Sequence, residues 1–168
     1  DVRDAIANLR EGPPPAQSLQ EQLASLVQGI RHERLSWWAP DNPPLYLPAE
    51  MREQILHIAG EAIHNAVRHS GASRIQVSLI RSPHQAVLRI ADNGSGFDPS
   101  LSPSDGKKHF GLDIMRARAS QIDGTLTIES QPGQGSCIAL TFPLAGNRID
   151  AGQGIEPLES PLPVELAE

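Results

Sequence analysis

The sequence predicts an α/β fold, and two features of its hydrophobic pattern indicate this class. Segments with apolar residues at helical spacing alternate with short segments in which every second residue is apolar. The 14 glycines and 15 prolines of this 168-residue chain gather mostly between those segments, as loops around one compact centre require. Helices interleaved with hairpin-like pairs of strands are typical of a sheet packed against helices.

The first part of the chain is predicted to contain two helices and a first strand. Residues 1–11 have the pattern of the end of a helix, and the proline run within residues 12–16 stops it and forms a stiff linker. Apolar residues recur at amphipathic spacing over residues 19–30, which predicts a second helix. A strand is expected around Trp37-Trp38, with residues 45–47 returning as its partner.

The longest predicted helix spans about residues 49–69 and carries the most informative side chains. With about 100° between successive residues, its isoleucines and alanines gather on one broad side. Glu61, Asn65 and Arg68 fall within a narrow stripe on the opposite side. This stripe is flanked by His64 and His69.

The rest of the chain reads as two pairs of strands with a helix between them. Gly71 has the position of a helix C-cap, and alternating strands are predicted around residues 75–79 and 88–90. The later elements are a helix over about residues 112–122 and strands over 125–129 and 136–142.

Glu61 and Asn65 lie one helical turn apart, so their carboxylate and carboxamide oxygens face the same region. Such oxygens are ligands for a hard cation such as Mg²⁺, beside phosphates and water. Arg68 adds a cation one turn further on, where a phosphate chain would lie. The alternative is that these side chains form only an exposed polar face of the helix.

The segment D-N-G-S-G-F directly follows a predicted strand. Asp92 can accept a hydrogen bond from an exocyclic amine, and Gly94 and Gly96 allow a ligand ring to approach the backbone closely. The same pattern is also that of an ordinary turn. It lacks the later oxygen ligands of a calcium-binding EF-hand loop, which argues against calcium.

A polar loop leads into the segment H-F-G-L at the start of the next predicted helix. Gly111 would let backbone N–H groups face an anion at the positive end of that helix. Lys107 and Lys108 precede it and are placed to contact the same phosphates, unless they form only a solvated loop tip. Ser136 follows G-Q-G, which by itself is typical of a hairpin turn.

In this order and spacing, the four motifs resemble the N, G1, G2 and G3 boxes of the ATP-binding domain shared by histidine kinases, gyrase-type ATPases and Hsp90-type chaperones. The resemblance covers about residues 50–143. The segments E-A-I-H-N-A-V-R-H-S-G-A-S-R-I, D-N-G-S-G-F and H-F-G-L-D-I-M-R-A-R-A look like those of sensor histidine kinases of the nitrate/nitrite-sensor type. The resemblance implies the two-layer α/β sandwich of that family (the Bergerat fold), a mixed sheet with helices on one face and ATP held between.

The resemblance also implies the chemistry of the site. ATP and Mg²⁺ would bind, and the γ-phosphoryl would pass to a histidine of a dimerisation domain that this sequence lacks. Asn65 would ligate Mg²⁺, Glu61 would act beside it as a catalytic carboxylate, and Asp92 would hold the adenine amino group. The other implied nucleotide-binding residues are Arg68, His69, Gly94, Gly96, Phe97, Lys107, Lys108, Gly111, Leu112 and Ser136.

Domain organisation and partners follow from the same resemblance. Residues 1–11 would end the dimerisation helix and residues 17–143 would form the catalytic domain of a homodimeric sensor that acts on a response regulator. The family's phosphoacceptor would lie upstream, because the one histidine–acid pair here, His32-Glu33, follows the linker. Two alternatives stay open: a serine protein kinase similar to anti-sigma factors, and a nucleotide-binding regulator without transfer activity.

Composition argues against several other classes. The 14 Lys and Arg against 20 Asp and Glu give a net charge of −6, which disfavours nucleic-acid binding. Residues 144–168 carry −4 of this charge together with several prolines, and are predicted to be a disordered tail. No apolar run reaches the roughly 18 residues of a membrane span and no signal peptide opens the chain, so no direct membrane contact is expected.

The single Cys137 excludes an internal disulfide and suits a reducing compartment. The chain begins with Asp1 rather than Met and is interpreted as part of a longer protein. With the resemblance, this predicts a cytoplasmic domain of an inner-membrane sensor.

Overall fold

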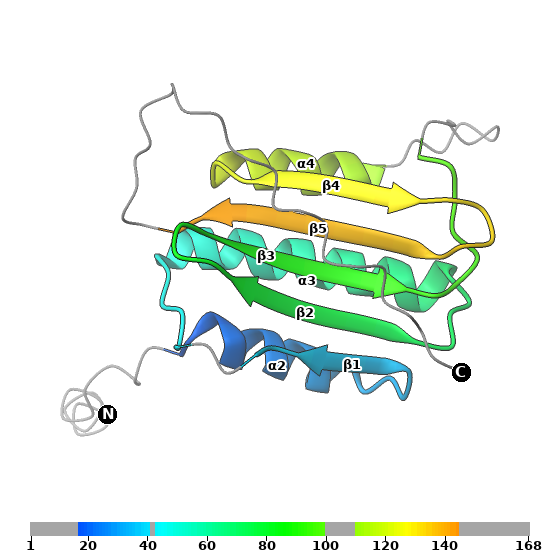
Figure 1. Ribbon diagram of the computed structural model, residues 1–168, viewed down its shortest axis with the longest axis horizontal. Coiled ribbons are helices and arrows are strands. Elements are labelled where there is room, and N and C mark those ends of the chain that lie inside the picture. The colour runs from blue at the N-terminus through cyan, green and yellow to red at the C-terminus, as the bar shows by residue number, and fades with distance from the viewer. Residues whose placement is uncertain (1–16, 41–42, 100–109, 145–168) are drawn as a thin grey trace, which may run out of the picture.

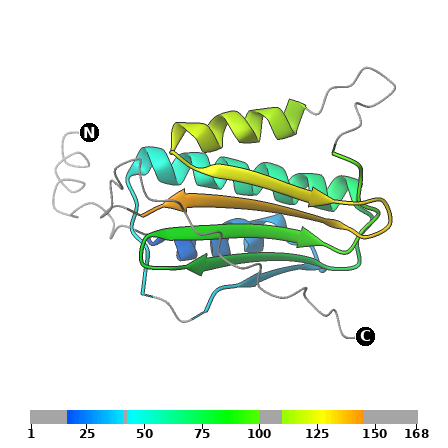
Figure 2. The same ribbon diagram turned by 45° about the horizontal axis from the view of Figure 1, so that its top comes forward.

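Five strands form one sheet, and the described helices cover one of its faces (Figure 1). The computed structural model describes residues 17–40, 43–99 and 110–144. The helices are α2 (Leu19–Ile30), α3 (Ala49–His69) and α4 (Phe110–Gln121). The strands are β1 (Leu35–Trp38), β2 (Ile75–Arg81), β3 (Gln85–Asp92), β4 (Thr125–Ser130) and β5 (Ser136–Pro143). Figure 2 shows α3 and α4 side by side above the sheet, which confirms the predicted two-layer α/β sandwich.

The predictions for residues 1–16, for Lys107 and Lys108, and for the tail from residue 145 onward lie outside the described residues. Among the helices of the described ranges, none has the combination of length and apolar character that crossing a bilayer requires.

The sheet is mixed, with the strand order β1-β2-β3-β5-β4. β1 runs parallel to β2, and all other neighbouring strands are antiparallel. The pairing of β3 with β5 sets Asp92 opposite Ser136, and the pairing of β3 with β2 sets Asp92 opposite Ile75. The last residue of β3 therefore lies between two neighbouring strands, at the end of the sheet where the site is formed.

One prediction for the first part of the chain is wrong. Residues 43–48 form no strand, and β1 pairs with β2 instead. The backbone of Leu45 is held by α2: its carbonyl oxygen accepts a 2.8 Å hydrogen bond from the N–H of Leu19, and its N–H donates to Oε1 of Gln20 at 2.9 Å. The prolines around Leu45 lack the N–H groups that a ladder needs, so the segment buries Leu45 and Leu47 without strand pairing.

The hydrophobic core lies between the sheet and the helices, with α3 at its centre. The buried residues of α3 are those of the predicted apolar side: Ile55, Ile58, Ala59, Ala62, Ile63 and Ala66. In β2, Ile75, Val77 and Leu79 are buried and the residues between them are partly exposed, as the alternation predicts. The same alternation in β3 buries Leu88 and Ile90 against the helices.

Local signals set the ends of two helices. Ser18 caps α2: its hydroxyl accepts from the N–H of Glu21, whose carboxylate accepts from the N–H of Ser18 at 2.7 Å. These hydrogen bonds to the Ser18 backbone and hydroxyl lower the pKa of the Glu21 carboxyl. After α3, Gly71 has a φ of +60°, a left-handed conformation that favours glycine and ends the helix.

Candidate functional site

A pocket of about 420 Å³ opens between α3, α4 and the neighbouring ends of β3 and β5. Its volume lies within the range of pockets that hold small ligands. The sequence-predicted site residues that line it are Glu61, Asn65, His69, Asp92, Gly96, Phe97, Gly111, Leu112 and Ser136. The fold thus brings together segments that are far apart in the sequence.

The α3 wall of the pocket is a row at i, i+4 and i+8: Glu61, Asn65 and His69. Each step of four residues turns the row by about 40° toward the buried side of the helix. Glu61 and Asn65 are half-buried and His69, at the end of the helix, is exposed, so the polar stripe borders the apolar side rather than lying opposite it. Arg68 lies at a different angle around the helix axis from this row. Its side chain is exposed and does not line the pocket.

Asp92, the last residue of β3, carries the carboxylate of the opposite wall. Its Oδ1 accepts a 2.9 Å hydrogen bond from the N–H of Gly94, and Ser136 lies opposite Asp92 in the pairing of β3 with β5. Burial raises the pKa of the Asp92 carboxyl above its usual range, and the polar groups of Gly94 and Ser136 offset only part of that effect. The site therefore holds a partly desolvated acceptor with a defined direction.

Gly94 and Gly96 are required by contacts within the protein. A Cβ on Gly94 would collide with the carbonyl oxygen of Ser70, and a Cβ on Gly96 would collide with that of Gln131. Gly96 also has a φ of +60°. Gly94 does not line the pocket, so its role is to let the loop after β3 pack against the end of α3.

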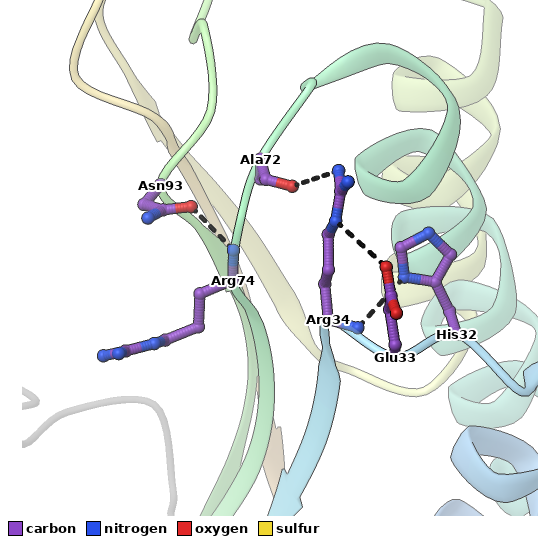
Figure 3. A network of polar contacts seen from close by, with 6 residues as sticks. All are labelled: His32, Glu33, Arg34, Ala72, Arg74 and Asn93. Atoms are coloured by element: carbon purple, nitrogen blue, oxygen red, sulfur yellow. Dashed lines mark hydrogen bonds and ion pairs between the residues drawn. The ribbon is translucent and has the colours of Figure 1, made fainter.

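A polar network of residues that do not line the pocket joins this loop to the loop after α3 (Figure 3). The side chain of Asn93 accepts a 2.9 Å hydrogen bond from the N–H of Arg74 and donates to Oγ of Ser73 at 2.9 Å. Arg34 reaches the same loop from the turn before β1, donating to the carbonyl oxygen of Ala72 at 3.1 Å. In that turn, Nδ1 of His32 accepts from the N–H of Arg34 at 3.4 Å.

The start of α4 lies directly over the α3 row. A Cβ on Gly111 would come within 2.7 Å of Oε1 of Glu61, so glycine permits this approach. Further along the two helices, Arg118 donates a 2.8 Å hydrogen bond to Oε1 of Gln54. The first turn of α4 is thus held beside Glu61 and Asn65, and its residues Gly111 and Leu112 line the pocket.

Comparison with known proteins identifies the family of the chain. Residues 50–146, more than half of the chain, match the model of the family described as histidine kinase-, DNA gyrase B-, and HSP90-like ATPase. The chain belongs to this ATPase family. All the pocket-lining residues lie within the matched range.

Curated relatives of this ATPase domain are sensor proteins. The chain is 39% identical over 101 residues to the nitrate/nitrite sensor protein NarQ of Escherichia coli, an alignment that covers 60% of this chain and 17% of NarQ. It is 32% identical over 152 residues to the sensor protein VraS of Staphylococcus haemolyticus, covering 89% of this chain and 42% of VraS. The chain therefore spans less than half the length of these relatives.

Solved structures with this fold are ATP-binding domains and histidine kinases. The ATP-binding domain of PrrB from Mycobacterium tuberculosis superimposes with a TM-score of 0.55 at 26% identity, covering 75% of this chain and 93% of that domain. The histidine kinase AdeS of Acinetobacter baumannii superimposes with a TM-score of 0.60 at 18% identity, covering 85% of this chain and 74% of that chain. At 18% identity, the match with AdeS is evidence for a shared fold alone.

The donor set of the ATPase pocket is chemically suited to magnesium. The carboxylate of Glu61 and the carboxamide of Asn65 are hard oxygen donors on one wall. Within the described ranges, no group of three or more His, Cys, Asp and Glu side chains is arranged to hold a metal ion. A Mg²⁺ ion held by these two oxygens would take its remaining ligands from phosphate and water, as it does in nucleotide sites.

Sequence reasoning missed the apolar floor of the ATPase pocket. Ile90 and Ile138 face each other across β3 and β5 and line the pocket two residues from Asp92 and Ser136 on their strands. The period of two predicts this, because residues i and i+2 of a strand share a face. The contribution of Ser70 and Ser95 to the lining depends on the loop packing and has no comparable signal in the sequence.

Proposed function

We propose that this domain binds ATP with Mg²⁺ and that the full-length protein transfers the γ-phosphoryl group to a histidine of a dimerisation domain. The observation that carries the proposal is the pocket itself: it sets the carboxylate of Asp92 on one wall and the row of Glu61, Asn65 and His69 on another. One end is thus suited to a purine base and the other to a phosphate chain. Membership of the ATPase family supports this assignment of the two ends.

At the base end, Asp92 is the hydrogen-bond acceptor for the adenine amino group. The hydrogen bond from the N–H of Gly94 holds the carboxylate in place, and Ile90 and Ile138 offer apolar contacts to a flat ring. A carboxylate accepts hydrogen bonds and, when ionised, donates none, so it pairs with an amino group and disfavours a carbonyl oxygen at the same position. This predicts a preference for adenine over guanine.

At the phosphate end, Asn65 and Glu61 supply the oxygens that would hold Mg²⁺. When bound, the ion neutralises phosphate charge. The start of α4 around Gly111 lines the pocket beside Glu61, where the backbone N–H groups of a helix start can contact phosphate oxygens. His69 lines the pocket two helical turns, about 12 Å, further along α3. Glu61 is also in place to orient an incoming acceptor group by accepting its hydrogen bond. Arg68 is exposed and does not line the pocket, so it can act on the phosphates only through longer-range charge interactions.

The acceptor histidine is proposed to lie on another domain. His64 and His69 are on α3, the helix that forms the pocket wall, and the ring of His32 is engaged in the turn before β1. In-line transfer requires the reacting atoms to approach to about 3–3.5 Å, which a residue of the pocket wall does not achieve.

Residues 1–11 are proposed to end the dimerisation helix and residues 12–16 to be the linker. The predicted start of the tail at residue 144 is wrong, because Leu144 is buried in the core and its N–H donates a 2.9 Å hydrogen bond to the carbonyl oxygen of His84. The proposed acidic tail is therefore residues 145–168.

The partners and location proposed for the whole protein rest on the relatives. NarQ and VraS are named as sensor proteins, and DegS of Bacillus subtilis, 34% identical over 99 residues, as a signal transduction histidine-protein kinase/phosphatase. By analogy, we place this domain on the cytoplasmic side of a homodimeric membrane sensor that passes its phosphoryl group to a response regulator.

A reconstitution experiment tests the proposal. The 168-residue chain, γ-labelled ATP and Mg²⁺ are mixed with a separately prepared dimerisation domain, and acid-labile phosphate is measured on each protein. Label is expected on the dimerisation domain only, and only while its histidine is intact. Acid-labile label on the chain alone would overturn the proposed division of labour.

The same experiment separates the alternatives. Transfer to a serine of a partner protein would support a serine kinase similar to anti-sigma factors. Binding of ATP without transfer to any partner would support a nucleotide-binding regulator.

A further inference from the structure

The antiparallel ladder of β2 and β3 continues for one pair of residues beyond the strands, and a side chain closes it. The last pair within the strands is Ile75 with Asp92. In the next pair, the N–H of Asn93 donates to the carbonyl oxygen of Arg74 at 3.2 Å, and the N–H of Arg74 donates to Oδ1 of Asn93 at 2.9 Å (Figure 3). In an ordinary ladder the second of these bonds goes to a main-chain carbonyl oxygen. The Asn93 side chain therefore takes the place of its own main-chain carbonyl.

The peptide group between Asn93 and Gly94 is thereby released from the ladder and points its N–H at Asp92. The N–H of Gly94 donates a 2.9 Å hydrogen bond to Oδ1 of Asp92. The amide of Asn93 is held from a second side as well, because its Nδ2 donates to Oγ of Ser73 at 2.9 Å. Hydrogen bonds thus lead from the loop after α3 to Asn93, and from the peptide group that follows Asn93 to the carboxylate of Asp92.

We propose that Asn93 is a positioning residue for adenine recognition, which acts through the N–H of Gly94 on the carboxylate of Asp92. While the Asn93 side chain closes the ladder, the N–H of Gly94 holds Oδ1 of Asp92 and fixes the direction of the carboxylate. Asn93 is exposed and does not line the pocket, so it acts without contacting the nucleotide. This inference rests on the proposed function, since it concerns the base end of the ATP pocket.

The effect of Asn93 is local, because the rest of the loop after β3 has anchors of its own. The N–H of Ser95 donates to the carbonyl oxygen of Ser70 at 2.7 Å. The N–H of Phe97 donates to Oγ of Ser130 at 2.8 Å. Ser95 and Phe97 both line the pocket, and these hydrogen bonds hold them without Asn93.

Loss of the Asn93 side chain has a definite consequence for the carboxylate. In Asn93→Ala, the N–H of Arg74 is expected to turn to its ordinary ladder partner, the main-chain carbonyl oxygen of residue 93. That exchange rotates the following peptide group and withdraws the N–H of Gly94 from Asp92. The ladder keeps its number of hydrogen bonds, so the fold is expected to persist while the carboxylate loses its fixed direction.

The competing explanation is that Asn93 only ties the loop after β3 to the loop after α3. Loss of a tie of that kind would lower the free energy of unfolding and would weaken all nucleotides alike. A positioning residue for the amino-group acceptor instead changes the discrimination between nucleotides with and without that amino group.

The experiment measures dissociation constants by calorimetry for ATP and for purine riboside triphosphate, which lacks the 6-amino group. In Asn93→Ala, ATP affinity is expected to fall about threefold to tenfold, the range of one ordinary hydrogen bond, while affinity for the analogue changes less than about twofold. Ser82→Ala is the matched control, because the Ser82 hydroxyl closes the opposite end of the same two strands through Gln85 and does not line the pocket. Equal weakening of both nucleotides in Asn93→Ala would overturn the inference.

Two conservative variants separate the hydrogen bonds of the Asn93 side chain. Ser73→Ala removes only the acceptor of Nδ2. Asn93→Asp keeps an oxygen for the N–H of Arg74 and loses only the donor to Ser73. Both variants are expected to keep the discrimination of the parent within about twofold, because the side chain still closes the ladder. Loss of discrimination in either variant as complete as in Asn93→Ala would contradict the role of the Oδ1 acceptor.

A measurement without nucleotide separates this inference from the proposed function. Burial raises the pKa of the Asp92 carboxyl, and the hydrogen bond from the N–H of Gly94 offsets part of that rise. Carbon NMR titration of the unliganded chain is therefore expected to show a higher pKa of Asp92 in Asn93→Ala than in the parent, and no change in Ser82→Ala. An unchanged pKa in Asn93→Ala would overturn the inference whether or not ATP binds. If the parent binds no ATP, the proposed function fails; if it binds ATP and Asn93→Ala discriminates as the parent does, only this inference fails.

Discussion

The carbonyl oxygen of Ser70, at the end of α3, accepts a 2.7 Å hydrogen bond from the backbone N–H of Ser95 in the loop after β3. Between the two segments, Gly94 lies so close to Ser70 that no Cβ fits. The helix that carries Asn65 and the loop that follows Asp92 are therefore held together by contacts within the protein. Because both ends of a bound nucleotide would contact this unit, its rigidity lowers the ordering cost of binding.

Gly94→Ala is expected to destabilise the fold by more than about 1 kcal/mol, because its methyl group would force the loop away from Ser70. Urea unfolding measures this change. Gly60→Ala is the control: Gly60 lies within α3 with open space around its Cβ direction, so alanine should stabilise the helix by about 0.5–1 kcal/mol. Equal effects of the two substitutions would contradict the assigned role of Gly94.

Asn65→Ala is expected to abolish the dependence of ATP binding on Mg²⁺, because it removes the carboxamide oxygen from the phosphate end of the pocket. Calorimetry with and without Mg²⁺ measures the effect. His64→Ala is the matched control, since His64 is the neighbouring exposed residue of α3 and does not line the pocket. The assignment would be wrong if the parent and Asn65→Ala both bound ATP equally with and without the metal.

Asp92→Ala is expected to weaken ATP binding by about tenfold to a hundredfold, the range of one hydrogen bond to a charged group. Titration calorimetry provides the dissociation constants, and thermal unfolding reports whether the fold persists. In the parent, GTP is expected to compete poorly with ATP. Normal ATP binding by Asp92→Ala, or equal competition by GTP in the parent, would contradict the assignment of Asp92 as the acceptor for the adenine amino group.

The raised pKa of Asp92 predicts a pH dependence of stability without ligand. The folded protein binds the Asp92 proton more tightly than the unfolded chain, so this group contributes stability below the ordinary aspartate pKa of about 4. That contribution is lost as the pH rises through the raised pKa. The free energy of unfolding of the parent, relative to Asp92→Asn, should therefore fall across this window and level off above it. Urea unfolding at a series of pH values measures the difference, and a rising difference would contradict the burial of this carboxylate.

Much of the fold could be predicted because local patterns and tertiary packing agree. The apolar side of α3 and the alternation in β2 are the faces that the core buries, so periodicity identified them. The prediction of a strand around Leu45 was wrong. Two buried leucines between prolines have the pattern of a strand, but the hydrogen-bond partners of the Leu45 backbone come from α2. Which backbone groups pair across distant segments is decided by the assembled chain.

The sequence by itself determined the chemical types of the site residues and the strand end on which Asp92 lies. Only the tertiary structure decided that His69 lines the pocket and Arg68 does not, because the direction of a helix row matters only once a neighbouring wall exists. It also decided the hydrogen bonds of Ser130, whose hydroxyl meets the N–H of Phe97 and the hydroxyl of Ser136 from other segments of the chain. Hydrogen bonds of this kind join residues without a shared local period, so no pattern along the chain predicts them.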